Sequence, residues 1–232
     1  MKSGRLSLVA LSFALAAFCN SAFATTVTVG TNQTNLDNEY PFGSSGYAGD
    51  YQQVYSSSNF TGPVNIMSIA FFSGIDYPGT SISGTYILDL STTSSSVGTL
   101  STTYSANLGG NNTQVFDGSV SDVLSFSTTP FLYDPSQGNL LLTVDVITPN
   151  SVSQNFLAAG CSTATNRVYN SGGSGAVTIG FAGGCSPSDY GLETQFTTTP
   201  AVSATPEPSS LVLLGTAAAG LFGAARRRLR RD

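Results

Sequence analysis

The residues that most enzymes use for catalysis are scarce in this sequence of 232 residues. It has no histidine, which excludes Ser-His-Asp and Cys-His catalysis and a His-ligated zinc site. Between Thr25 and Thr205 there is no lysine for a Schiff base, and neither a P-loop nor a G-x-G-x-x-G motif occurs. A carboxylate pair of the glycosidase type remains, from Glu39 and Glu193, the only glutamates of that stretch. Because such a pair alone has little specificity, we expect a protein that is not an enzyme.

Aromatic side chains beside polar groups could instead bind sugars. Four tyrosines cluster in the segment "EYPFGSSGYAGDYQQVY", and these candidate sugar contacts are Tyr40, Tyr47, Tyr51 and Tyr55. The same tyrosines could equally cover a core, and the chain lacks tryptophan, the usual stacking residue. A carbohydrate-binding β-sandwich module is therefore the alternative function.

Two oxygen-rich segments could suit Ca²⁺, one with Asp134 and Asn139 and one with Asp117 and Asp122. Neither matches an EF-hand loop, and Asp, Ser and Gly are ordinary turn residues. We expect no metal site and no cofactor.

Cys161 and Cys185 are the only cysteines after residue 24. An even pair in an exported chain predicts a disulfide. Two cysteines without histidine cannot fill a tetrahedral metal site.

The first 24 residues have the three parts of a secretory signal peptide. Lys2 and Arg5 form a positive start, residues 6–18 are apolar, and Ala22-Phe23-Ala24 provides a small-x-small cleavage site. Cleavage there would leave Thr25 as the mature N-terminus.

Near the other end, an apolar stretch at 209–225 is followed by a cluster of arginines: Arg226, Arg227, Arg228, Arg230 and Arg231. Seventeen residues are at the short end of what spans a bilayer as a helix. The positive-inside rule predicts that the basic tail 226–232 stays cytoplasmic. Pro206-Glu207-Pro208 precedes the apolar stretch and keeps the chain extended there.

The segment "PEPSSLVLLGTAAAGLFGAARRRLRR" resembles the PEP-CTERM sorting signal of Gram-negative bacteria. That signal combines Pro-Glu-Pro, a Ser-rich start, a short apolar helix and an arginine cluster, and the resemblance covers only about residues 205–231. It implies recognition by an exosortase, transient anchoring in the inner membrane, and release or transfer at the cell surface. Members of the family tend to accompany exopolysaccharide and biofilm systems, so the resemblance also implies a polysaccharide partner.

Charge is sharply segregated along the chain. Between Thr25 and Thr205, Arg167 is the only basic residue against eleven acidic ones, which gives this stretch a net charge of −10. Such a body repels nucleic-acid phosphates and anionic lipid head groups, so we expect no nucleic-acid partner.

The elements that must position these residues are strands. Apolar and polar residues alternate with period two at 25–31, 84–92, 139–148, 175–183 and 190–198, while 64–74 is apolar on both faces. Gly, Pro, Asn and Asp fill the gaps as turn residues. We therefore predict an all-β, antiparallel, jelly-roll-like β-sandwich at 25–198, followed by a linker at 199–208.

Overall fold

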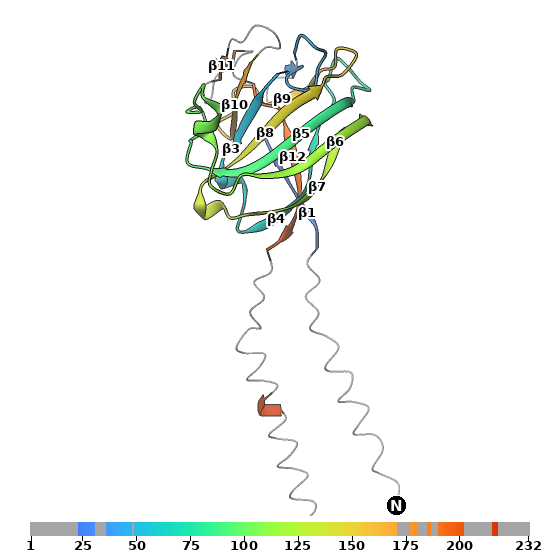
Figure 1. The fold of residues 1–232 in the computed structure, drawn as a ribbon. Coiled ribbons are helices and arrows are strands. Elements are labelled where there is room, and N and C mark those ends of the chain that lie inside the picture. Colours follow the sequence, from blue (N-terminus) through green and yellow to red (C-terminus); the bar gives the residue numbers. More distant parts are fainter. Residues whose placement is uncertain are drawn as a thin grey trace, which may run out of the picture. The chain divides into compact units, whose positions relative to one another are not determined.

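The structure is a computed structural model that describes residues 23–30, 36–47, 49–170, 177–180, 185–186, 190–201 and 215–217. The chain divides into two compact units, 1–201 and 202–232. In the second unit the described residues 215–217 form a single helical turn. The first unit contains the β-structure (Figure 1).

The described strands form two main antiparallel sheets and a small one. The four-stranded sheet has the spatial order β1 (Thr25–Val29), β12 (Thr194–Pro200), β4 (Val64–Phe71), β7 (Ser125–Tyr133). The six-stranded sheet has the order β11 (Val177–Ile179), β10 (Thr165–Asn170), β3 (Tyr51–Tyr55), β8 (Asn139–Thr148), β5 (Ile82–Thr93), β6 (Thr113–Val123). β2 (Leu36–Asn38) pairs with β9 (Phe156–Ala158). In the described part of the chain, short 3₁₀ turns lie between successive strands: η1 (Ser57–Asn59) after β3, η2 (Tyr104–Asn107) after β5 and η3 (Pro135–Gln137) after β7.

Antiparallel partners are nested along the chain. β1 pairs with β12, β3 with β8, β4 with β7, and β5 with β6, and successive pairs alternate between the two main sheets. This order agrees with the predicted jelly-roll-like arrangement, and β10 and β11 add a hairpin beside β3. The all-β, antiparallel prediction is confirmed.

Aromatic side chains fill the core between the two main sheets. Tyr55 of β3 and Phe196 of β12 face each other across the sandwich with ring centroids 4.9 Å apart. Phe42, in the turn after β2, packs against Phe71 of β4 at 4.8 Å and Tyr86 of β5 at 5.4 Å. Edge-to-face and tilted ring pairs of this kind stabilise a core beyond the apolar area that they bury.

A second cluster lies on the outer face of the six-stranded sheet. Leu141 of β8, Val54 of β3 and Val168 of β10 are buried there together with Leu100. Leu100 belongs to the segment between β5 and β6. This segment therefore covers an outer face that would otherwise meet water.

The predicted ends of the chain lie mostly outside the described residues. The signal peptide at 1–24 is described only at Phe23 and Ala24, and the apolar span at 209–225 only at 215–217. Among the described residues, no helix is both long and apolar enough to cross a membrane. β12 ends at Pro200, two residues beyond the predicted end of the sandwich.

Candidate functional site

Two of the four candidate sugar-binding tyrosines belong to the core. All five residues of β3 are buried, because this strand lies between β10 and β8 and packs on both faces. Tyr51 and Tyr55 are 1% and 0% exposed, and burial raises the pKa of both hydroxyls. The prediction that they contact a sugar at the surface is therefore corrected. The sequence did not predict this burial, because the polar Gln52 and Gln53 interrupt the apolar pattern of the strand.

The other two tyrosines meet in a pocket of about 250 Å³, which we call the tyrosine pocket. Tyr40 and Tyr47 come from the turn after β2, and their ring centroids lie 5.3 Å apart, nearly edge to face. Tyr169 of β10 packs against Tyr40 at 4.3 Å, and Tyr190 completes the aromatic lining. Of these rings, that of Tyr47 is the most exposed, with 37% of the residue's surface accessible to solvent.

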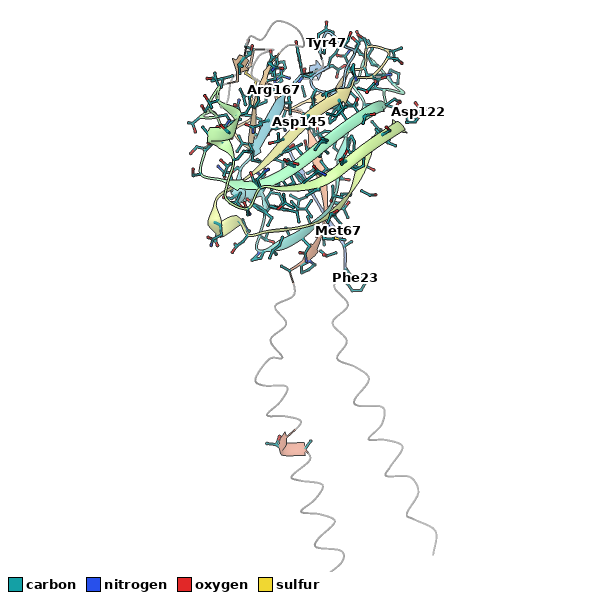
Figure 2. All side chains as sticks on the ribbon, in the orientation of Figure 1. Phe23, Tyr47, Met67, Asp122, Asp145 and Arg167 are labelled. Atoms are coloured by element: carbon teal, nitrogen blue, oxygen red, sulfur yellow. A yellow bond between two sulfur atoms is a disulfide. The ribbon has the colours of Figure 1, made fainter. Side chains whose placement is uncertain are left out.

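Arg167 of β10 also lines the pocket and packs against two of these rings. It is 1% exposed, and its guanidinium carbon lies 4.2 Å from the Tyr169 centroid and 5.4 Å from that of Tyr40. It is also hydrogen-bonded to Tyr51. Burial lowers the pKa of Arg167, and the neighbouring tyrosines oppose that shift. A guanidinium stays charged in proteins, so the ring faces hold the cation by cation–π contacts. Figure 2 labels Tyr47 and Arg167.

Acidic and amide side chains form the polar part of the pocket. The Asp37 carboxylate accepts hydrogen bonds from the backbone N–H groups of Ile75 and Asp76 at 3.2 and 3.4 Å. A Cβ at Gly74 would come within 2.6 Å of the Asp37 Oδ2, so a glycine is needed for this approach.

The remaining polar groups of the pocket are Glu39, Asn38 and Asn155. Ser153 Oγ donates to Glu39 Oε2 at 3.0 Å, and partial burial raises the Glu39 pKa. Asn38 Nδ2 donates to the Tyr190 carbonyl at 3.2 Å. Glu193, the other predicted carboxylate, is not among the residues that line the pocket.

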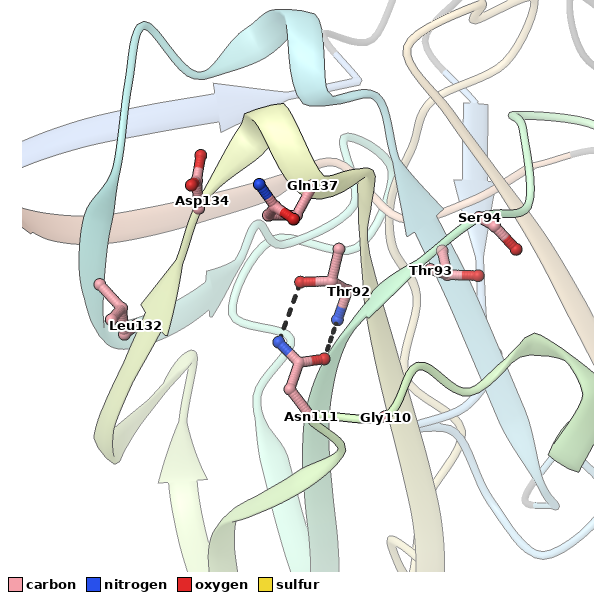
Figure 3. A pocket seen from close by; sticks show the side chains of 8 residues that line it. All are labelled: Thr92, Thr93, Ser94, Gly110, Asn111, Leu132, Asp134 and Gln137. Carbon is pink, nitrogen blue, oxygen red and sulfur yellow. Dashed lines mark hydrogen bonds between the residues drawn. The ribbon is translucent and has the colours of Figure 1, made fainter.

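A second hollow, of about 450 Å³, lies between the end of β5 and the turn after β7 (Figure 3). Asn111 accepts a hydrogen bond from the Thr92 backbone N–H at 2.8 Å and donates to Thr92 Oγ1 at 3.0 Å. Asp134 caps η3 by accepting from the Ser136 backbone N–H at 3.0 Å, which lowers the Asp134 pKa. The Asn111 and Asp134 side chains of this hollow therefore make hydrogen bonds that stabilise the local turns.

In the two segments considered for Ca²⁺, Asn139 and Asp122 also make hydrogen bonds within the fold. Asn139 accepts from the Ser57 backbone N–H and donates to the Ser95 carbonyl, both at 2.9 Å. Asp122 accepts from Ser81 Oγ at 3.1 Å. Within the described part of the chain, no three His, Cys, Asp or Glu side chains gather in a way that could hold a metal ion.

Cys161 and Cys185 form a disulfide, with their Cα atoms 4.5 Å apart. The Tyr190 hydroxyl donates to the Cys185 carbonyl at 2.8 Å. The disulfide is thus linked to a wall of the tyrosine pocket.

Comparison with known proteins identifies the C-terminal segment only. Neither a curated protein nor a solved structure matches the chain. Residues 204–229 match the family described as the PEP-CTERM protein-sorting motif. The match includes Pro206, Glu207 and Pro208 and the first three arginines of the cluster, all outside the described residues. The chain therefore carries a PEP-CTERM protein-sorting motif, which implies export, sorting to the cell surface and an exosortase as the processing partner.

Proposed function

We propose that this chain is a non-catalytic structural protein of the cell surface or extracellular matrix, associated with exopolysaccharide. The observation that carries the proposal is the sorting motif at residues 204–229. In this proposal, the signal peptide directs export, and the apolar stretch 209–225 holds the chain in the inner membrane until an exosortase acts.

The body itself supports a structural role. The sequence has no histidine, and the described acidic side chains do not gather into a metal site. Most charged side chains of the body are acidic, which suits a soluble surface protein that neither binds nucleic acid nor adheres to anionic membranes. The strands β1 and β12, at the two ends of the body, are paired neighbours (Figure 1).

The test is to compare the protein in producer cells with and without their exosortase. We expect a shortened form at the surface or in the medium when the enzyme is present, and full-length protein in the inner-membrane fraction when it is deleted. The same size and location in both strains would overturn the sorting part of the proposal. For the matrix part, the exported protein should bind to polysaccharide prepared from the producer, and failure to sediment with it would overturn that part.

A further inference from the structure

The tyrosine pocket is lined by residues outside the sorting motif at 204–229, and polar and aromatic side chains make up its lining. It combines four aromatic rings with two carboxylates and two side-chain amides in about 250 Å³. Ligand sites typically pair an apolar wall with a few convergent polar groups and measure about 300–1,000 Å³ for drug-sized molecules. The smaller volume suits a single sugar unit of a longer glycan that extends into solvent.

The charges around the pocket restrict the ligand. Arg167 already occupies the ring faces of Tyr40 and Tyr169, so a cationic ligand would meet its positive charge there. Asp37 and Glu39 line the pocket, so an anionic ligand would meet their negative charge. An uncharged ligand with many hydroxyl groups avoids both penalties.

Two polar groups of the pocket are available for such a ligand. Among the described residues, neither the Asn155 side-chain amide nor the Tyr47 hydroxyl has a protein hydrogen-bond partner. An amide offers both donors and an acceptor, and a phenol offers one donor and accepts as well. A sugar hydroxyl also donates and accepts, so its hydrogen bonds can be satisfied by these groups.

We propose that the tyrosine pocket binds one uncharged sugar unit of a glycan, with Tyr47 as the exposed ring against which the sugar packs. Tyr40 and Tyr169 form part of the pocket wall, and Arg167 holds these two rings by cation–π contacts. This inference deepens the proposed function and rests on its association with a polysaccharide, whereas sorting depends on residues 204–229, outside the pocket.

The experiment uses the exported protein, purified as it occurs at the surface. The probes are uncharged oligosaccharides of glucose, galactose, mannose and N-acetylglucosamine on an array, with oligosaccharides that contain glucuronic acid or glucosamine as charged counterparts. Titration calorimetry with the best uncharged probe then compares the wild type with Tyr47→Ala, Tyr47→Phe and Tyr77→Ala. Tyr77 is the matched control, because its side chain is 52% exposed and does not line the pocket.

We expect binding of at least one uncharged probe, a loss of about tenfold in Tyr47→Ala, and a smaller loss in Tyr47→Phe, which keeps the ring. Tyr77→Ala should bind like the wild type, and the thermal melting of all variants should be unchanged. The proposal is overturned if no uncharged probe binds, if charged probes bind better, or if Tyr47→Ala binds as well as the wild type. An equal loss in Tyr77→Ala would also overturn it, because the site would then lie elsewhere. None of these outcomes depends on processing by the exosortase, which the comparison of cells with and without that enzyme tests separately.

Discussion

Gln53 links the six-stranded sheet to the segment just before β12 through buried hydrogen bonds. It lies on β3, and its side-chain Nε2 donates to the Leu192 carbonyl at 2.7 Å and to Thr165 Oγ1 at 2.9 Å. Its Oε1 accepts from the Leu192 N–H at 2.9 Å. We expect Gln53→Leu to lower the free energy of unfolding by about 2–4 kcal/mol, because the Leu192 N–H loses its buried acceptor and the Leu192 carbonyl keeps only Thr194 Oγ1 as a donor.

Gln195→Leu is the matched control for this change. Gln195 lies on β12, and its amide donates to Thr28 Oγ1 at 3.2 Å at the exposed side of the sheet. Removing a solvent-accessible bond of this kind should cost less than about 0.5 kcal/mol. Urea unfolding of both variants measures the difference in the free energy of unfolding. Equal losses would show that the buried Gln53 hydrogen bonds stabilise the fold no more than the exposed Gln195 bond does.

Asp145 of β8 should make stability depend on pH. Burial raises its pKa, and the nearby carboxylates of Asp50 and Asp89 raise it further. The folded state therefore binds this proton more tightly than the unfolded state does. The resulting contribution to stability is full below the unfolded pKa of about 3.9 and is lost as the pH rises through the higher folded pKa.

Replacing Asp145 by Asn should therefore stabilise the protein at pH 7 and have little effect at pH 3. The gain should be at most about 0.5 kcal/mol, because the carboxylate is partly exposed and screened. Thermal unfolding at the two pH values measures it. Asp76→Asn, in an exposed loop, removes the same charge and serves as the control. A gain in Asp145→Asn that is the same at pH 3 and pH 7 would contradict the linkage to this proton.

At the scale of elements, the disulfide joins two segments that lie 24 residues apart in the chain. Closing a loop of this length should stabilise the fold by roughly 3–4 kcal/mol in the chain-entropy model. We expect reduction to lower the melting temperature by about 10 °C. The double variant Cys161→Ser with Cys185→Ser should melt at the reduced value and should not respond to reductant. If both cysteines of the exported protein are alkylated without prior reduction, the bond does not form in the cell.

Most strands could be predicted from alternation, because their polar face meets water. The pattern at 139–148 predicted β8, and Leu140, Leu142 and Val144 are all 0% exposed as expected. Leu141 is also buried, which the alternation did not predict, because the segment with Leu100 covers this outer face. The cause lies about forty residues away in the sequence, where no local pattern shows it.

The tyrosine pocket could be predicted only in part for a similar reason. Clustering along the chain identified Tyr40 and Tyr47, but it also selected Tyr51 and Tyr55, which lie in the core. Their partners Tyr169 of β10 and Tyr190 near Cys185 could not be predicted, because they come more than a hundred residues later in the chain. The sequence showed Arg167 as the only basic residue of the body, but only the structure shows that it packs against the rings of the pocket.

At the scale of the whole molecule, the start of β1 coincides with the predicted signal-peptide cleavage site. β1 begins at Thr25, whose Oγ1 lies 3.0 Å from Thr198 Oγ1 of β12. We expect N-terminal sequencing of exported protein to start at Thr25, because Ala22 and Ala24 provide the small residues that signal peptidase needs. An exported form that still starts at Met1 would contradict the signal-peptide prediction.

Two parts of the sorting segment should have separable functions. Pro206-Glu207-Pro208 should be recognised by the exosortase, and the arginine cluster should stop translocation. Arginines at the centre of a membrane cost about 2.5–3.5 kcal/mol each, so the basic cluster should keep the tail on the cytoplasmic side. Replacing its five arginines with serine should therefore let the tail pass through, and uncut protein should leak to the medium. Replacing Pro206-Glu207-Pro208 with alanines leaves the apolar stretch and the arginines unchanged. That variant should stay full-length in the inner membrane, because the exosortase no longer recognises it.

Size on a gel and membrane fractionation distinguish the two effects, and each variant is the control for the other. The alanine variant should be insensitive to deletion of the exosortase, whereas the wild type should shift from the cut to the full-length form. The serine variant should be found outside the cells whether or not the enzyme is present. If the alanine variant is cut like the wild type, the exosortase does not recognise the Pro-Glu-Pro element, and the segment acts only as a membrane anchor. If the serine variant is retained and cut normally, the arginines do not stop translocation, and the apolar stretch alone fixes the orientation.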